Sequence, residues 1–177
     1  AASRAFKGNV YFIFQPAEEN KGGGRVMVEE GLFERFPCDA IFALHNWPGL
    51  AAGKIAVQPG PMMASFDTFD IVLKGVGGHA AMPEKARDPL VAASEFVLAL
   101  QTIVSRKLSA HDPAVLSVTQ MKGGETFNVI PGQCEVKGTW RCFDPEVRTF
   151  IRDEIDRILA SVCAAHQIDY DAEYEFG

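Results

Sequence analysis

Apolar residues gather in two short runs near the start of the chain, at residues 10–14 and 39–44. The first run is rich in aromatic and β-branched residues and is stopped by Pro16, a pattern typical of a buried strand. Residues 23–31 lie between the runs and predict a short helix that ends at a glycine. The order strand, helix, strand predicts two parallel strands in an α/β domain.

Polar side chains follow each of these runs directly. Glu18 and Glu19 come after the first run, and His45 comes after the second. Open parallel sheets bind ligands outside the carboxyl ends of their strands, so all three side chains are expected at one sheet edge. A carboxylate and an imidazole can ligate zinc or a similar ion, while the other carboxylate accepts a proton from a metal-activated water. The alternative is that these are solvent-exposed residues without a chemical role.

From residue 66 onward the pattern changes to alternating strands and amphipathic helices. The predicted elements are a strand at 66–74, a helix that begins after Asp88, strands at 115–121 and 133–143, a helix that begins after Asp144, and a strand at 168–174. Both helices are expected to begin at an aspartate cap followed by a proline. The order βαββαβ is the ferredoxin-like plan, with both helices on one face of the sheet.

The strand predicted at 133–143 sorts its side chains by face. Alternation sends one set toward the core, which consists of Cys134, Val136, Trp140 and Cys142. Arg141 lies on the opposite face. Its guanidinium is therefore available either to bind an anion through two hydrogen bonds or simply to be solvated.

Composition and charge narrow the function classes. The 177 residues are 47% hydrophobic, carry a net charge of −6 and give a pI near 5.2. This acidic balance argues against a nucleic-acid partner or an anionic membrane surface. No apolar stretch is long enough to cross a bilayer, and no basic segment with an apolar leader begins the chain. The four cysteines form no CxxC pair, so we expect reduced thiols in a cytoplasmic protein.

Two other interpretations of the pattern remain. An RNA-recognition domain shares the order βαββαβ, although the acidic charge and the lack of an aromatic and basic signature on the central strands count against it. Residues 75–80 also match the loose dinucleotide-binding pattern G-x-G-x-x-A. A phosphate-binding turn must open directly into a helix, and here the helix is expected only after Asp88.

Four consecutive motifs give the chain a family resemblance. They are Gln-Pro-Ala-Glu-Glu at 15–19, Ala-Leu-His-Asn-Trp-Pro-Gly at 43–49, Gly-Gly-His-Ala-Ala-Met-Pro at 77–83 and Asn-Val-Ile-Pro at 128–131. In this order they resemble the aminoacylase and hippurate hydrolase family of co-catalytic metallopeptidases, which cleave N-acyl amino acids and related amides. The resemblance covers nearly the whole chain and implies a metal-dependent amidohydrolase.

The resemblance implies a role for residues in each motif. Glu18 resembles the general base, and Glu19 and His45 resemble ligands of a site for two divalent ions such as zinc or manganese. His79 resembles the lid histidine that stabilises the oxyanion of the tetrahedral intermediate, often across a dimer. The residues that resemble those holding the carbonyl and the carboxylate of the substrate are Asn128 and Arg141. A homodimer formed through the lid is therefore expected, with an N-acyl amino acid or small peptide as substrate.

Other metal ligands of the family have no counterpart in this chain. The family places one metal-binding segment before the Gln-Pro-Ala-Glu-Glu strand and another histidine after the lid, and Cys38, His111 and His166 fall at neither place. We therefore expect residues 1–63 to be part of the catalytic α/β domain and residues 64–177 to be the ferredoxin-like lid and dimerisation domain. The alternative to an active enzyme is that this chain alone is a lid and dimerisation module without catalysis.

Overall fold

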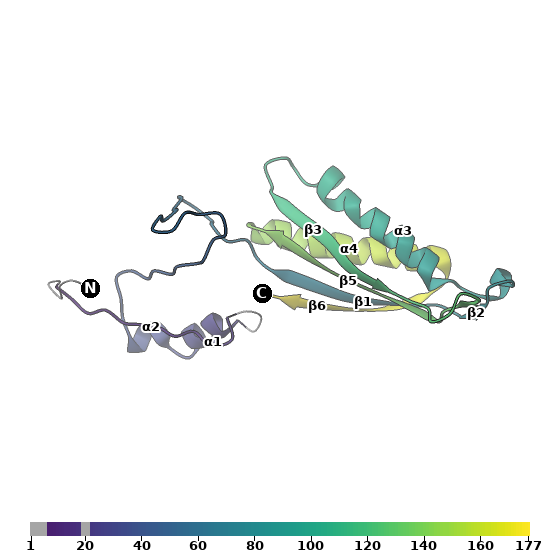
Figure 1. Cartoon of the computed structure of the whole chain (residues 1–177), viewed down its shortest axis with the longest axis horizontal. Helices are drawn as coiled ribbons and strands as arrows, with labels where there is room; N and C mark the ends of the chain where they lie inside the picture. Colours follow the sequence, from purple (N-terminus) through teal and green to yellow (C-terminus); the bar gives the residue numbers. More distant parts are fainter. Residues whose placement is uncertain (1–6, 19–21) are drawn as a thin grey trace. The chain divides into compact units, whose positions relative to one another are not determined.

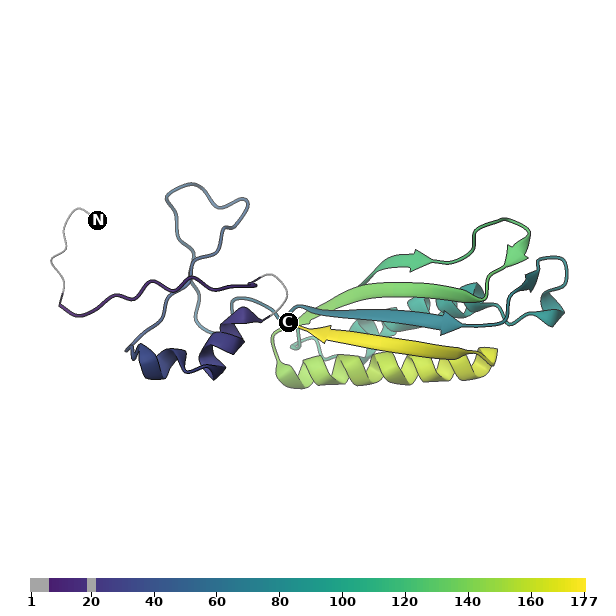
Figure 2. The same ribbon diagram turned by 90° about the horizontal axis from the view of Figure 1, so that it is seen from below.

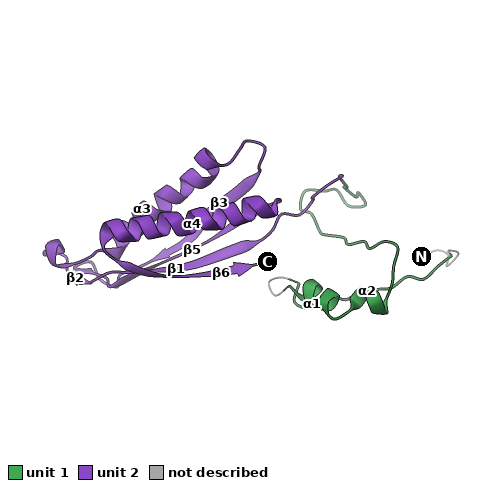
Figure 3. Cartoon of the chain, turned by 180° about the vertical axis from the view of Figure 1, so that it is seen from behind, with its two compact units in different colours: residues 1–57, 177 green, residues 58–176 purple. Residues whose placement is uncertain are grey.

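The computed structural model describes residues 7–18 and 22–177 of the chain. The chain divides into two compact units, one of residues 1–57 with residue 177 and one of residues 58–176 (Figure 3). All strands found in the described residues belong to the larger unit. None of the helices in these residues is both long and apolar enough to cross a membrane.

The larger unit is built on a four-stranded antiparallel sheet (Figure 1). In spatial order its strands are β3 (Ala114–Lys122), β5 (Gln133–Cys142), β1 (Asp67–Lys74) and β6 (Asp169–Phe176). Helices α3 (Pro89–Thr102) and α4 (Pro145–His166) lie on one face of this sheet (Figure 1, Figure 2). The arrangement confirms the mixed α/β class and the ferredoxin-like order of elements.

The core of the larger unit lies between the sheet and the two helices. Strand β5 contributes the four side chains predicted to face inward, each at most 2% exposed: Cys134, Val136, Trp140 and Cys142. Trp140 stacks on Phe69 of β1, with 6.4 Å between the ring centroids. Gly138 makes room for this contact, because a Cβ at that position would collide with the Phe69 ring. The opposite face of β5 carries Glu135, Lys137, Thr139 and Arg141.

Both long helices begin at the predicted aspartates, whose side chains cap the first turn. Oδ1 of Asp88 accepts a hydrogen bond from the backbone N–H of Leu90 at 2.8 Å, and Oδ1 of Asp144 accepts one from Glu146 at 2.7 Å. In each helix a proline fills the first position, where no backbone donor is needed. The starts of α3 and α4 are therefore set by local sequence.

Several short elements of the larger unit were not predicted. Strand β2 (Gly78–His79) pairs with β4 (Val129–Ile130) in a two-stranded sheet, the 3-10 turn η1 (Pro83–Lys85) follows β2, and the π-helical turn η2 (Ile103–Lys107) extends α3. Because residues 75–80 lead into β2 and not into a helix, they lack the geometry of a dinucleotide-binding turn.

The smaller unit contains two short helices, α1 (Gly23–Glu29) and α2 (Leu32–Arg35). Helix α1 confirms the helix predicted over residues 23–31. It ends before Gly31, whose φ of 88° lies in the left-handed region that glycine adopts without strain.

The two apolar runs of the smaller unit differ from the prediction. Residues 10–14 and 39–44 were expected to be parallel strands, but the described residues of this unit contain no strand. A strand needs a ladder partner and, in a parallel sheet, layers that cover both faces. Phe12 is 84% exposed and Phe42 is 91% exposed, so these runs have neither. The expected βαβ pairing is therefore absent from the described residues.

Candidate functional site

The predicted general base, Glu18, and the predicted metal ligand His45 lie in the smaller unit. Glu18 is exposed in the turn after Pro16, and Glu19 lies outside the described residues. His45 is also exposed, and its Nδ1 lies 2.5 Å from the carbonyl oxygen of Asn46. Because a carbonyl oxygen only accepts, Nδ1 of His45 is the donor in this contact. A histidine that donates from Nδ1 has Nε2 as the ring nitrogen available to ligate a metal ion.

The described residues do not complete a metal site. No group of three or more His, Cys, Asp and Glu side chains among them is placed to hold an ion. The described residues offer the imidazole of His45, a predicted ligand, and the carboxylate of Glu18, the predicted general base; both donor types suit zinc or manganese. Catalytic zinc ordinarily takes about three protein ligands. The donor types therefore fit a divalent ion, but their number in this part of the chain does not.

The predicted lid histidine lies on β2, at one end of the four-stranded sheet (Figure 1). Nδ1 of His79 accepts a hydrogen bond from the backbone N–H of Ala81 at 3.0 Å. A ring nitrogen that accepts carries no proton, so the neutral ring keeps its proton on Nε2. The exposed side chain therefore presents an Nε2–H donor, the group that a developing oxyanion requires.

The pairing of β2 with β4 brings Asn128 beside His79. His79 lies opposite Val129, and the backbone N–H of Ala80 donates to the carbonyl oxygen of Asn128 at 3.0 Å. Oδ1 of Asn128 accepts a hydrogen bond from the Thr126 hydroxyl at 3.1 Å, which leaves the amide NH2 group as the donor toward solvent. Residues 78–80 and 126–130, called the donor tip below, therefore carry two neutral side-chain N–H donors.

Two residues that support the donor tip were not predicted. A Cβ at Gly77 would lie 2.8 Å from the carbonyl oxygen of Ile130, so glycine allows β2 and β4 to approach each other. Thr126 orients Asn128 through the hydrogen bond to Oδ1. The sequence signal that could have found Thr126 is a hydroxyl residue two positions before an asparagine in a glycine-flanked turn.

Arg141 lies at the other end of the sheet from the donor tip. Strand β5 begins at Gln133, close to β4, and Arg141 is eight residues further along it. At about 3.3 Å per residue these eight steps span roughly 26 Å. The side chain is exposed, as predicted, and its Cζ lies 4.5 Å from the ring centroid of Phe66. The structure thus brings His79 and Asn128 together and keeps Arg141 apart.

Known proteins are similar in sequence to most of this chain. Residues 1–151 match the model of peptidase family M20/M25/M40. The chain is 44% identical over 170 residues to the N-acetylcysteine deacetylase of Bacillus subtilis (strain 168) and 41% identical over 168 residues to the hippurate hydrolase of Campylobacter jejuni. These alignments cover 96% and 95% of this chain but 43% and 44% of the relatives. The chain therefore spans less than half the length of these curated relatives.

Solved structures give the same result for the fold. A structure from methicillin-resistant Staphylococcus aureus, provisionally assigned as an aminohydrolase, matches with a TM-score of 0.83 and 32% identity over 92% of this chain and 43% of that chain. A dinuclear metal-binding M20 peptidase of Bacillus subtilis matches with a TM-score of 0.67 and 34% identity over 92% of this chain and 39% of that chain. These matches decide against the RNA-recognition alternative. The chain belongs to peptidase family M20/M25/M40.

Proposed function

We propose that the protein to which this chain belongs hydrolyses the amide bond of N-acyl amino acids, such as hippurate, or of small peptides. The observation that carries this proposal is the donor tip, where β2 and β4 hold His79 and Asn128 together as neutral N–H donors. The relatives support the substrate class, because two of them are an N-acetylcysteine deacetylase and a hippurate hydrolase.

In this proposal each site residue has one task. Glu18 is the general base, which accepts a proton from the attacking water and passes it to the leaving amine. The Nε2–H group of His79 donates to the oxyanion of the tetrahedral intermediate, and the amide of Asn128 donates to the substrate carbonyl. Arg141 binds the substrate carboxylate through two parallel hydrogen bonds.

The proposal includes two divalent ions, zinc or manganese, with Glu19 and His45 among their ligands. Such ions, when bound, lower the pKa of water and polarise a carbonyl oxygen. A dinuclear metal-binding M20 peptidase among the similar structures supports the number of ions. The described residues supply too few ligands for such a site, so its other ligands have to come from outside them.

We also propose that residues 1–63 are part of the catalytic domain and that residues 64–177 are the lid and dimerisation domain. Strand β5 spans roughly 26 Å from Gln133, at the end of the sheet that carries the donor tip, to Arg141, and an N-acyl amino acid is much shorter than this distance. One copy therefore cannot hold both the carbonyl and the carboxylate of one substrate with these residues. A homodimer solves the problem if one copy supplies His79 and Asn128 and the other supplies Arg141.

The sheet itself offers a way for two lids to join. Its edge strands are β3 and β6. In the described residues, one row of backbone N–H and C=O groups on each edge strand has no partner strand. Such edges commonly pair with a second copy about a twofold axis.

Substitution of Glu18 tests the proposed reaction in the complete natural protein. Glu18→Gln should lower kcat for hippurate by at least about a hundredfold, the usual scale for a lost general base, with an unchanged metal content. Glu19→Gln is the matched variant, and it should lower the metal content measured by elemental analysis. Turnover close to wild type in metal-loaded Glu18→Gln would remove Glu18 from the reaction.

The alternative, a module without catalysis, concerns the 177 residues taken alone. We expect these residues neither to bind zinc at micromolar affinity nor to release glycine from hippurate, because two suitable ligands leave an ion mostly to solvent. Calorimetry with zinc and an assay for glycine check both points. Tight binding together with turnover would show that the site is built within these residues.

A further inference from the structure

On the open face of β5, Arg141 and Lys137 differ in their carboxylate neighbours. Lys137 pairs with Asp70 at 2.5 Å and with Glu135 at 2.8 Å, and these hydrogen bonds raise the pKa of Lys137. No such carboxylate partner for Arg141 is found in the part of the chain that the structure describes. Its charge is therefore not neutralised by a neighbour on its own sheet.

Uncharged side chains surround Arg141 on this face. Val115 lies directly opposite it on β3, and Thr139 precedes it by two residues on β5. On the remaining side lies the ring of Phe66, whose centroid is 4.5 Å from the Arg141 Cζ. A guanidinium is attracted to the face of an aromatic ring, and stacking on the ring leaves the N–H groups at its edge available for an anion.

Hydrogen bonds and strand pairing hold the backbone on both sides of Phe66 to β5. On one side, the N–H of Ser65 donates to the carbonyl oxygen of Cys142 at 2.8 Å. On the other side, Asp67 lies opposite Trp140 in the β1–β5 ladder. Phe66 therefore continues the register of this ladder and faces Arg141.

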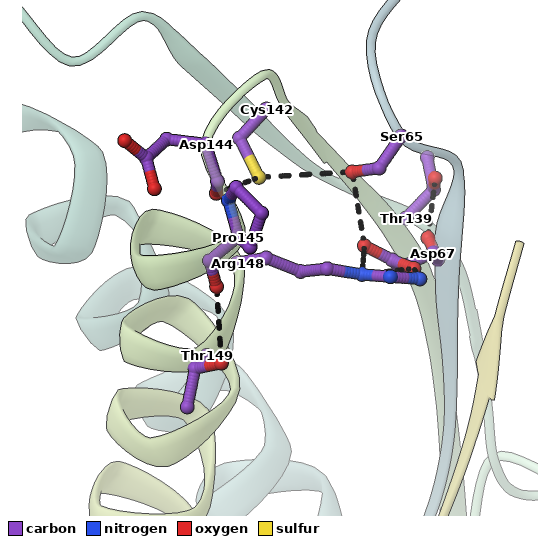
Figure 4. Close-up of polar contacts among 8 residues, drawn as sticks. All are labelled: Ser65, Asp67, Thr139, Cys142, Asp144, Pro145, Arg148 and Thr149. Carbon is purple, nitrogen blue, oxygen red and sulfur yellow. Dashed lines mark hydrogen bonds and ion pairs between the residues drawn. The ribbon is translucent and has the colours of Figure 1, made fainter.

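A buried ion pair fixes Asp67 further (Figure 4). The Asp67 side chain is fully buried and pairs with the guanidinium of Arg148 on α4. The hydroxyl of Ser65 donates to Oδ2 of Asp67 at 3.2 Å, and the hydroxyl of Thr139 donates to its backbone carbonyl at 2.7 Å. The segment that carries Phe66 is thus held to both the sheet and the helix layer.

We propose that Phe66 is a positioning residue for Arg141. The ring of Phe66 holds the Arg141 guanidinium flat, so that the N–H edge of the guanidinium faces the substrate carboxylate. The inference rests on the proposed function, because it takes Arg141 as the carboxylate-binding residue. An arginine side chain on an open surface loses rotamer freedom when it binds a ligand, and a ring that orders it beforehand reduces this loss. Phe66 therefore strengthens the preference for substrates that carry a free carboxylate.

The test compares two substrates in the complete natural protein, hippurate and hippuramide, which lacks the carboxylate charge. Phe66→Leu should raise KM for hippurate by about two- to fivefold, the factor that corresponds to an exposed cation–π contact. The kcat for hippurate and both constants for hippuramide should stay unchanged. Phe66→Tyr and Phe66→Trp should keep the wild-type KM, because both retain an aromatic face.

Phe143→Leu is the matched control, since Phe143 is 42% exposed and lies two residues beyond Arg141. It should leave the kinetics of both substrates unchanged. If Phe143→Leu raised KM for hippurate as much as Phe66→Leu, loss of any large apolar side chain near Arg141 would have the same effect. The role of Phe66 would then be overturned.

Arg141→Met separates a failure of this inference from a failure of the proposed function. It should remove the preference for hippurate over hippuramide, a loss of about tenfold or more for a charged hydrogen-bonded pair. An intact preference in Arg141→Met would overturn the role of Arg141 and with it that of Phe66. A lost preference in Arg141→Met, combined with a wild-type KM in Phe66→Leu, would overturn the role of Phe66 alone. In the Arg141→Met background, Phe66→Leu should have no further effect.

Discussion

The two ends of the four-stranded sheet offer different chemical groups. The donor tip carries neutral N–H donors on His79 and Asn128, whereas the opposite end carries Arg141, a permanent cation that lies on an aromatic ring. Neutral donors suit negative charge that develops only during the reaction, and a cation suits a carboxylate that is present throughout. Under the proposed function, the donor tip serves turnover and the arginine end, residues 65–67 and 139–143, serves binding.

The two ends are also held in place by different interactions. The donor tip depends on the short ladder of β2 and β4 and on a few hydrogen bonds at its surface. The arginine end is fastened by the buried pair of Asp67 and Arg148, which links the start of β1 to α4. Loss of the Asp67–Arg148 pair should therefore change stability, and substitutions at the donor tip should change activity.

The largest expected effect is on the stability of the arginine end. Arg148→Met leaves the carboxylate of Asp67, which is 0% exposed, without its guanidinium partner, and should cost about 3–5 kcal/mol in the free energy of unfolding. Asp67→Asn should cost less, because the Arg148 side chain is 30% exposed and water can reach it. Urea unfolding of the 177-residue chain measures both. Equal costs would contradict the asymmetry in burial.

At the donor tip, loss of a side chain should affect turnover and leave stability unchanged. His79→Ala in the complete natural protein should lower kcat by about 10²–10³, the usual effect of removing one oxyanion donor, with little change in KM. Urea unfolding should give the wild-type free energy, because His79 is exposed. A raised KM with unchanged kcat would reverse the roles assigned to the two ends.

The smallest effect concerns Glu154 and its two cationic partners on the helices. Glu154 on α4 binds Arg157 and Lys107, and these hydrogen bonds lower the pKa of Glu154 from 4.5 to about 2. A lowered pKa in the folded state stabilises the protein above the ordinary pKa, and this contribution is lost as the pH falls toward 2.

Glu154→Gln should therefore lower the free energy of unfolding by about 0.5–1 kcal/mol at pH 7. The difference from wild type should shrink below about pH 4.5 and be lost as the pH falls through about 2. Glu84→Gln serves as the control, since the structure shows no ion pair for it in the described residues. A difference that grows as the pH falls would contradict the direction of the pKa shift.

Local sequence signals predicted most of the larger unit. The caps Asp88 and Asp144 and the alternation of β5 depend on neighbouring residues alone, and the structure bears them out. The runs at 10–14 and 39–44 carry equally clear apolar patterns. Their strands depend on neighbours that the described residues do not provide, so a pattern alone could not decide their structure.

The candidate site was less accessible to sequence reasoning. Motifs singled out His79 and Asn128, but two-residue strands are too short for a period-2 pattern, so their pairing was not predicted. The contact of Phe66 with Arg141 depends on the register between β1 and β5, which is fixed by tertiary contacts and not by either strand. The roles of Glu18, Glu19, His45, His79, Asn128 and Arg141 stay predictions.

Mixed dimers test most directly the central claim that His79 and Arg141 serve one substrate from different copies. The complete natural protein is coexpressed as differently tagged His79→Ala and Arg141→Met variants, and the dimers that carry both tags are isolated. Each mixed dimer then holds one site with both residues intact, so at hippurate concentrations well below KM it should recover about half of the wild-type rate per dimer. Under the same conditions the Arg141→Met dimer should keep about a tenth of the wild-type rate or less, and the His79→Ala dimer about a hundredth or less. Mixed dimers no more active than the average of the two separate variants would contradict the account.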